Sequence, residues 1–156
     1  MKKIFLLLSL AISVLSGRCI AQANFNAFHI QDIAKQNIQF KQPIKRVILG
    51  NGNLAYAVAV INPKQQPFQS IIAWGDGFKV SDYTGYQAYR QRFPDLEKVP
   101  TFKDTDVSAV NLEKIISLRP DVVIFNLSSK SAIDGSNFPK SLAKLNIPIV
   151  YVDFSL

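Results

Sequence analysis

The chain has 156 residues, of which 48% are hydrophobic and 19% are charged, and its formal net charge is +7. This length suffices for one domain with a real core and falls short of two ordinary domains. Apolar residues are plentiful and no short unit repeats, which excludes a disordered chain, a collagen and a solenoid.

The first 23 residues are typical of an export signal rather than of a folded domain. A pair of lysines precedes the segment 4–15, which is apolar apart from serines, and Ala21-Gln22-Ala23 matches the small-x-small site of signal peptidase. The apolar run is too short for a bilayer core, which takes about 20 helical residues. We therefore expect a periplasmic protein that is cleaved after Ala23 and whose domain spans residues 24–156.

Cys19 allows an alternative in which the chain is a lipoprotein. A lipobox requires a small residue directly before the cysteine, and Arg18 stands there, so we favour cleavage without lipidation. The segment 24–156 then contains no cysteine, and packing must stabilise it without a disulfide. Its 15 basic and 11 acidic side chains are dispersed along the sequence, which argues against a nucleic-acid partner.

Four continuous apolar runs predict buried strands. An apolar run without alternation is typical of a strand covered on both faces, as in a parallel sheet flanked by helices. The runs are residues 47–49, 71–74, 122–125 and 149–152. Residues 30–40 are less regular and are expected to form a small hairpin ahead of the first parallel strand.

Three segments between these runs have helical character, so the expected fold is α/β with a parallel sheet of about four strands. They are residues 54–60, 111–118 and 138–145. In the second segment, Asn111 is expected to cap the helix and Glu113 to lie in its first turn, where the helix dipole favours a carboxylate. After the third, Asn146 is expected to adopt a left-handed conformation.

A ligand site is expected where the strands end, because open α/β sheets bind ligands outside the carboxyl ends of their strands. Small polar residues there can present backbone N–H groups and short side chains to a ligand, although turns require the same residue types. The long aromatic segment 78–106 adds Tyr83 as a candidate. The others are Asn51, Gly52 and Asn53, then Trp74, Gly75 and Asp76, and finally Asn126, Ser128 and Ser129.

One of these turns also matches a dinucleotide fingerprint. The pattern Gly50-x-Gly52-x-x-Ala55 follows a strand and precedes a helix, and Asp76 lies where a ribose-binding acid could stand. The alternative function is therefore an exported or mislocalised Rossmann-type oxidoreductase domain. The export signal argues against it, because nicotinamide cofactors are not free outside the cytoplasm.

No other catalytic or metal-binding set is apparent in the sequence. His29 is the single histidine, so neither a metal triad nor a Ser-His-Asp arrangement has its second ligand or a credible location. Asp104 and Asp106 are interpreted as solvated loop charges. We expect a protein that is not an enzyme and holds no metal or cofactor of its own.

Four stretches keep an order and spacing that cover nearly all of residues 24–156. They read KRVI at 45–48, FPDLEKVP at 93–100, NLEKIISLRPDVVI at 111–124 and IPIVYVD at 147–153. Together they resemble the periplasmic substrate-binding proteins of ATP-binding-cassette importers for iron complexes and vitamin B12, and the third stretch is the most specific. The Gly-rich turn that often precedes the first strand in that family is absent, and residues 35–37 stand in its place.

The resemblance implies two α/β lobes joined by a long helix, with the ligand held between them. This chain matches the N-terminal lobe, which is expected to be a fragment or the product of an interrupted reading frame. The candidate loops would form one wall of the cleft, with Trp74 or Tyr83 offering an aromatic face to an iron(III)–siderophore or similar chelate. Glu113 is similar to the acid that docks such lobes onto arginines of the inner-membrane permease.

The resemblance leaves the chelate and the oligomeric state open. Hydroxamate, catecholate, haem and cobalamin ligands are bound by relatives with different cleft residues. A single wall is expected to bind any of them weakly or not at all, because a pocket usually buries most of its ligand's surface.

The first testable prediction concerns processing. The periplasmic product should begin at Asn24 and carry no acyl chain, because Ala21 and Ala23 suit signal peptidase and Arg18 disrupts the lipobox. Mass spectrometry of the intact secreted product measures this directly. A product that begins at a lipid-modified Cys19 would contradict the prediction.

Overall fold

The computed structural model describes residues 25–61, 66–104 and 109–154. The expected export signal lies outside these residues. Among the helices that are described, none is long and apolar enough to cross a membrane.

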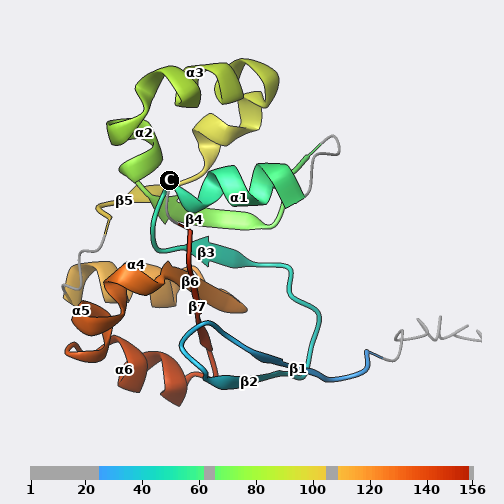
Figure 1. Ribbon diagram of the computed structural model, residues 1–156, viewed down its shortest axis with the longest axis vertical. Helices are drawn as coiled ribbons and strands as arrows, with labels where there is room; N and C mark the ends of the chain where they lie inside the picture. Colours follow the sequence, from blue (N-terminus) through green and yellow to red (C-terminus); the bar gives the residue numbers. More distant parts are fainter. Residues whose placement is uncertain (1–24, 62–65, 105–108, 155–156) are drawn as a thin grey trace, which may run out of the picture.

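A five-stranded parallel sheet forms the centre of the molecule (Figure 1), which confirms the expected α/β class. Its strand order is β5-β4-β3-β6-β7, and every neighbouring pair is parallel. The strands are β3 (Val47–Leu49), β4 (Ile71–Gly75), β5 (Thr101–Phe102), β6 (Val122–Asn126) and β7 (Ile149–Val152). The two-residue β5 was not predicted, because so short a segment shows no apolar periodicity.

Helices cover both faces of the sheet. One face packs against α4 (Ala109–Ser117), α5 (Lys130–Asp134) and α6 (Phe138–Lys144). The other packs against α1 (Leu54–Ile61), α2 (Gly77–Ser81) and α3 (Tyr83–Arg92). Two short 3-10 helices, η1 (Pro94–Lys98) and η2 (Leu127–Ser129), precede β5 and α5.

Each face has its own apolar cluster, because successive strand residues point to opposite sides. Ile48 of β3 and Val123 of β6 pack with Ile115 of α4 on one side. Leu49 of β3 packs with Leu54 of α1 on the other. The sheet is therefore buried on both faces, which is why its strands are continuous apolar runs in the sequence.

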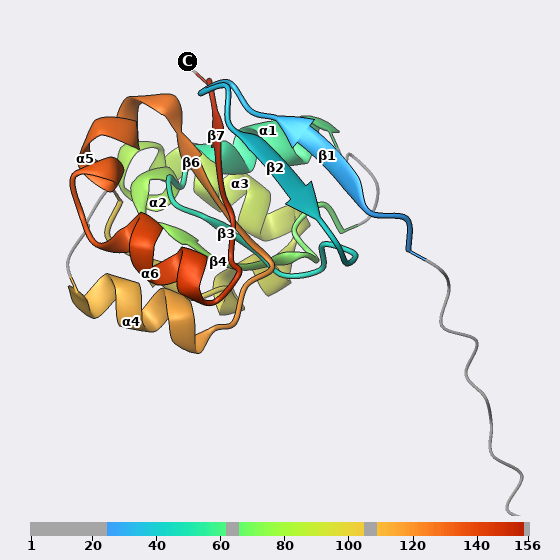
Figure 2. The same ribbon diagram turned by 90° about the horizontal axis from the view of Figure 1, so that it is seen from below.

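The predicted N-terminal hairpin is present and runs beside β7 (Figure 2). Strands β1 (Phe28–Gln31) and β2 (Asn37–Phe40) are antiparallel, and Ile38 and Phe40 are buried against Val150 of β7. The turn between them contains Lys35 at φ 61°. This apolar contact holds the hairpin over the end of the sheet.

Asp32 fastens the hairpin turn to the outer edge of β7. Its side chain is only 9% exposed, and its carboxylate accepts hydrogen bonds from Gln36 N (2.8 Å) and Tyr151 N (3.0 Å). Ile33 N donates to Tyr151 O at 3.3 Å. The turn therefore satisfies edge groups of β7 that would otherwise lack partners.

Helix α4 begins two residues before Asn111, the residue that was expected to cap it. The helix starts at Ala109, so Asn111 lies inside it, and Glu113 lies beyond its first turn. Asn111 Nδ2 instead donates to Lys103 O at 3.4 Å, which tethers the helix to the segment after β5. The capping role predicted for Asn111 is wrong, because Ala109 and Val110 extend the helix upstream.

The C-terminal end of α6 confirms the prediction made for Asn146. Asn146 has φ 57°, the left-handed conformation expected of it. Asn146 N donates to Ala143 O and Ile147 N donates to Leu142 O, both at 3.0 Å. These bonds close the helix and direct the chain into β7.

Replacing Asp32 tests the attachment of the hairpin. Asp32→Ala should lower the free energy of unfolding by about 1–3 kcal/mol, because it leaves the buried Tyr151 N–H without an acceptor. Asp32→Asn keeps one of the two acceptor oxygens and should cost less. Urea unfolding followed by Trp74 fluorescence measures both variants.

The matched control is Gln39→Ala on the exposed face of β2, which should change the free energy of unfolding by less than about 0.5 kcal/mol. Equal urea midpoints for Asp32→Ala and Gln39→Ala would show that the carboxylate does not hold the hairpin.

Candidate functional site

The carboxyl ends of all five strands meet at one edge of the sheet, which we call the crest. It comprises residues 50–53 after β3, 75–77 at the end of β4, 103–104 after β5, 126–129 at the end of β6 and 153–154 after β7. Parallel strands bring loops that are distant in sequence to the same edge, and this is where such sheets bind ligands.

Asp104 joins three loops of the crest through hydrogen bonds. Its Oδ1 accepts from Gly77 N at 2.9 Å and from Gly52 N at 3.1 Å, and Oδ2 lies 3.3 Å from Gly52 N. Asp104 N donates to Asp76 Oδ1 at 3.0 Å, and Asp76 N donates to Phe102 O at 2.7 Å. The ends of β3, β4 and β5 are therefore tied together by one carboxylate.

The interpretation of Asp104 as a solvated loop charge is wrong. Its carboxylate is partly buried and bonded to two backbone N–H groups, because β5 ends two residues earlier and directs it into the crest. Burial raises the pKa of Asp104, and the charge of Asp76 adds to this, whereas the hydrogen bonds from Gly77 and Gly52 act in the opposite direction. Asp106 lies outside the described residues.

Glycines make room for this carboxylate. A Cβ on Gly75 would overlap Asp104 Oδ1, and one on Gly77 would overlap Oδ2. A Cβ on Gly52 would overlap the backbone oxygen of Gly75. The loops after β3 and β4 are thus in direct backbone contact, which requires glycine on both sides.

Asn51 makes the second junction of the crest. Its Oδ1 accepts from Asn126 N at 2.8 Å, and Ser129 Oγ lies 3.3 Å from Oδ1 and 3.2 Å from Nδ2. Asn126 in turn donates from Nδ2 to Phe154 O at 2.7 Å and accepts from Ser128 N at 3.1 Å. These bonds link the ends of β3, β6 and β7.

The structure brings nearly all of the candidate residues together, but many of them serve the fold. Asn51, Asn126 and Ser129 bond to one another rather than facing an open space. Ser128 is exposed and Asn53 is half-buried at the start of α1. Tyr83, which is 60% exposed, begins α3 rather than lying in a crest loop.

Trp74 does not offer an aromatic face to a ligand, contrary to expectation. It is 2% exposed and packs edge-to-face against Phe68 and Phe78, with ring centroids 5.7 and 5.9 Å away. The reason is that β4 continues through Gly75, so Trp74 is still a strand residue and points into the core beneath α1 and α2.

The geometry argues against a dinucleotide at the Gly50–Ala55 fingerprint. A pyrophosphate would need the free N–H groups at the start of α1. The Gly52 N–H is already bonded to the Asp104 carboxylate. Asp76 is likewise engaged by the Asp104 backbone instead of being presented to a ribose.

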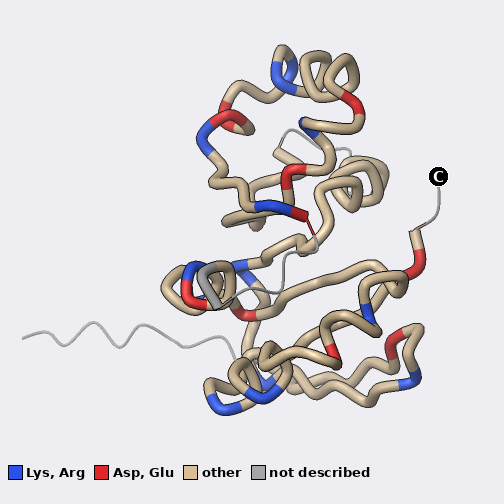
Figure 3. Tube along the Cα trace, turned by 90° about the vertical axis from the view of Figure 1, so that its left-hand side faces the viewer, with Lys and Arg blue, Asp and Glu red and all other residues tan. Residues whose placement is uncertain are grey.

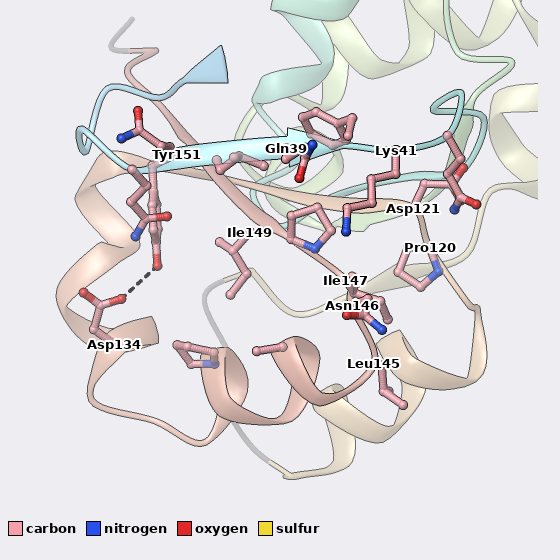
Figure 4. Close-up of a pocket in the computed structure, with 18 residues that line it drawn as sticks. Gln39, Lys41, Pro120, Asp121, Asp134, Leu145, Asn146, Ile147, Ile149 and Tyr151 are labelled. Atoms are coloured by element: carbon pink, nitrogen blue, oxygen red, sulfur yellow. Dashed lines mark hydrogen bonds between the residues drawn. The ribbon is translucent and has the colours of Figure 1, made fainter. Parts of the chain in front are cut away.

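A large groove lies elsewhere, on the outer side of β7 (Figure 4). It has a volume of about 800 Å³ and runs between the hairpin, β7 and α6. Tyr151 OH donates to Asp134 Oδ1 at 3.1 Å at one end of it, and burial raises the pKa of Tyr151. Within the described part of the chain, no three His, Cys, Asp or Glu side chains are grouped to bind a metal ion.

No protein-family model matches the sequence, and no curated protein matches it either. Solved structures nevertheless share the fold. The TroA-like periplasmic binding protein FepB from Veillonella parvula matches with a TM-score of 0.71 and 19% identity, over 80% of this chain and 36% of its own. A periplasmic solute-binding protein from Veillonella parvula matches with a TM-score of 0.61 and 24% identity, over 84% of this chain and 36% of its own.

CeuE from Helicobacter pylori, solved as a complex with Ni and His, matches with a TM-score of 0.56 and 17% identity, over 83% of this chain and 37% of its own. The chain thus spans little more than a third of the length of these proteins. Its fold is that of one part of a TroA-like periplasmic binding protein.

Substitutions of Asp104 test the bracing of the crest. At neutral pH, Asp104→Ala should lower the free energy of unfolding by about 2–4 kcal/mol, because it leaves the buried N–H groups of Gly52 and Gly77 unsatisfied. Asp104→Asn retains an acceptor oxygen and should cost less. Urea unfolding measures both, with the exposed Glu97→Gln as control.

The pH dependence follows from the raised pKa of Asp104. A carboxyl whose pKa is higher in the folded state contributes stability below its unfolded pKa and loses that contribution as the pH rises through the folded value. The stability advantage of the native protein over Asp104→Asn should therefore shrink as the pH rises from about 3 to 7. An advantage that grows with pH would contradict this assignment.

Proposed function

We propose that this chain is the N-terminal lobe of a periplasmic solute-binding protein that delivers an iron(III) chelate to an ATP-binding-cassette permease in the inner membrane. The observation that carries the proposal is that 80–84% of this chain matches only 36–37% of each solute-binding protein. A match of that extent is expected of one lobe.

The crest would form one wall of the ligand cleft. Its loops are braced by Asp104 and Asn51, so the wall is held in place before a ligand arrives, and this lowers the entropic cost of binding. Asn53 and Ser128 would contact the ligand, together with backbone groups beside Gly52, Gly75 and Asp76. Tyr83 would supply the aromatic contact that Trp74 does not.

Glu113 is proposed as the point of contact with the permease. It is exposed on α4, while the neighbouring Ile115 faces the core at 1% exposure and fixes the orientation of the helix. Lys114 Nζ donates to Thr101 O at 2.7 Å, which ties the same turn to β5. A carboxylate on such a firmly held turn is suited to pair with an arginine of a partner protein.

Titration of residues 24–156 with gallium(III) complexes of trihydroxamates, followed by two-dimensional NMR, tests the proposal. Gallium replaces iron because it is diamagnetic. We expect shifts confined to crest amides and a Kd of about 0.1–10 mM, since a single wall buries only part of the ligand while the cost of immobilising it is unchanged. NAD should cause no shift of the melting temperature, because a ligand stabilises only a state that binds it.

Ser128→Ala should weaken the chelate titration severalfold, whereas Gln39→Ala on the hairpin should leave it unchanged. Shifts that centre on the groove beside β7 would contradict the crest as the binding wall. Submicromolar affinity would contradict the assignment of this chain as half of a cleft.

A further inference from the structure

The charged residues of the crest indicate which net charge a ligand can carry, which the fold alone does not. The crest contains three carboxylates, those of Asp76, Asp104 and Asp153, and one ammonium group, that of Lys103. Figure 3 shows how basic and acidic residues are distributed along the chain. The wall proposed to face the chelate is therefore net negative.

All four arginines of the described residues lie toward the opposite edge, where the strands begin. Arg46 precedes β3, and its guanidinium donates to Leu118 O at 2.6 Å and to Arg119 O at 3.1 Å. Arg119 itself precedes β6, and Arg90 and Arg92 close α3 ahead of η1 and β5. The guanidinium fork, the side chain best suited to hold anionic oxygen atoms, is thus placed away from the crest.

The first N–H groups beside α1 and α2 at the crest are not available to a ligand either. A helix N-terminus attracts anions through its free N–H groups and its dipole. The N–H groups of Gly52, ahead of α1, and Gly77, at the start of α2, both donate to Asp104. An incoming anion would find these donors occupied and would meet the charges of Asp76 and Asp104.

Two further lysines follow crest loops, and both are directed to partners within the protein. Lys130, at the start of α5, pairs with Asp134, and its Nζ lies 5.4 Å from the ring centroid of Tyr151. Lys79 of α2 has its Nζ 5.7 Å from the ring centroid of Tyr86. The charge of Lys130 is therefore balanced by Asp134, whereas Lys79 keeps its charge and is directed toward the Tyr86 ring.

We propose that the crest discriminates among iron(III) chelates by net charge, accepting neutral or singly positive complexes and excluding triply negative ones. This inference rests on the proposed function and narrows its ligand class. In chemical terms it favours ferric trihydroxamates, which are neutral or singly positive, over ferric tris-catecholates, which carry three negative charges.

The test compares three gallium(III) complexes on residues 24–156 at pH 7.5 and low ionic strength. The probes are a singly positive linear trihydroxamate, a neutral cyclic trihydroxamate and a triply negative tris-catecholate. The trihydroxamates should shift crest amides, and the tris-catecholate should bind there at least about tenfold more weakly. The difference should narrow in about 0.5 M salt, where charges more than a few ångströms apart are screened.

The substitution Asp76→Asn tests the effect of one negative charge separately from the effect of the hydrogen bond that Asp76 accepts. The asparagine keeps an acceptor for Asp104 N, so the junction is preserved while one negative charge is removed. Binding of the singly positive complex should weaken about threefold and that of the tris-catecholate should strengthen by a similar factor. Glu97→Gln, in η1 at the opposite edge of the sheet, removes the same charge and should alter neither.

The outcomes separate this inference from the proposed function. A tris-catecholate that binds the crest as tightly as the trihydroxamates overturns the charge selection and leaves the crest as a binding wall. The same effect from Asp76→Asn and Glu97→Gln also overturns the charge selection. An absence of crest shifts with all three complexes overturns the proposed function and this inference with it.

Discussion

One partly buried side chain, that of Asp104, joins the ends of three strands. The Asp104 carboxylate accepts backbone N–H groups from the loops after β3 and β4, while its own N–H is held by Asp76. Without it, two buried donors at the ends of adjacent strands would have no partner, which costs more than the hydrogen bonds themselves contribute. The close approach of the two loops, possible only between glycines, follows from sharing this acceptor.

A crest braced in this way separates residues that the fold requires from residues that a ligand can use. Asn51, Gly52 and Asp104 are committed to joining strand ends, so a change at any of them alters the shape of the whole edge. Ser128 and Tyr83 are exposed, and the crest bonds of the Ser128 side chain are limited to one from its hydroxyl to Asn126 Oδ1 at 3.2 Å. Under the proposed function, ligand specificity would be carried by a small part of the polar sequence at the strand ends.

The same distinction explains how far the sequence could predict the structure. Strands β3, β4, β6 and β7 are buried on both faces, so hydrophobicity alone marks them, and the left-handed Asn146 follows from local turn chemistry. Trp74 lies in the core because β4 extends one residue further, through Gly75, than the apolar run 71–74 indicates. An apolar run does not define the end of a strand to a single residue. The role of Asp104 depends on β5, a strand of two residues whose existence is decided by its neighbour β4.

The dinucleotide-like fingerprint shows why a motif needs its electrostatic surroundings. The glycine spacing, the preceding strand and the following helix are all present, and in many proteins they leave N–H groups free for a phosphate. Here the protein supplies its own anion at that position, so the same backbone becomes a structural junction. An anionic ligand would find the N–H groups of Gly52 and Gly77 already bonded and, among the described residues, no arginine in the crest loops. The local geometry is that of an anion site, and the Asp104 carboxylate already occupies it.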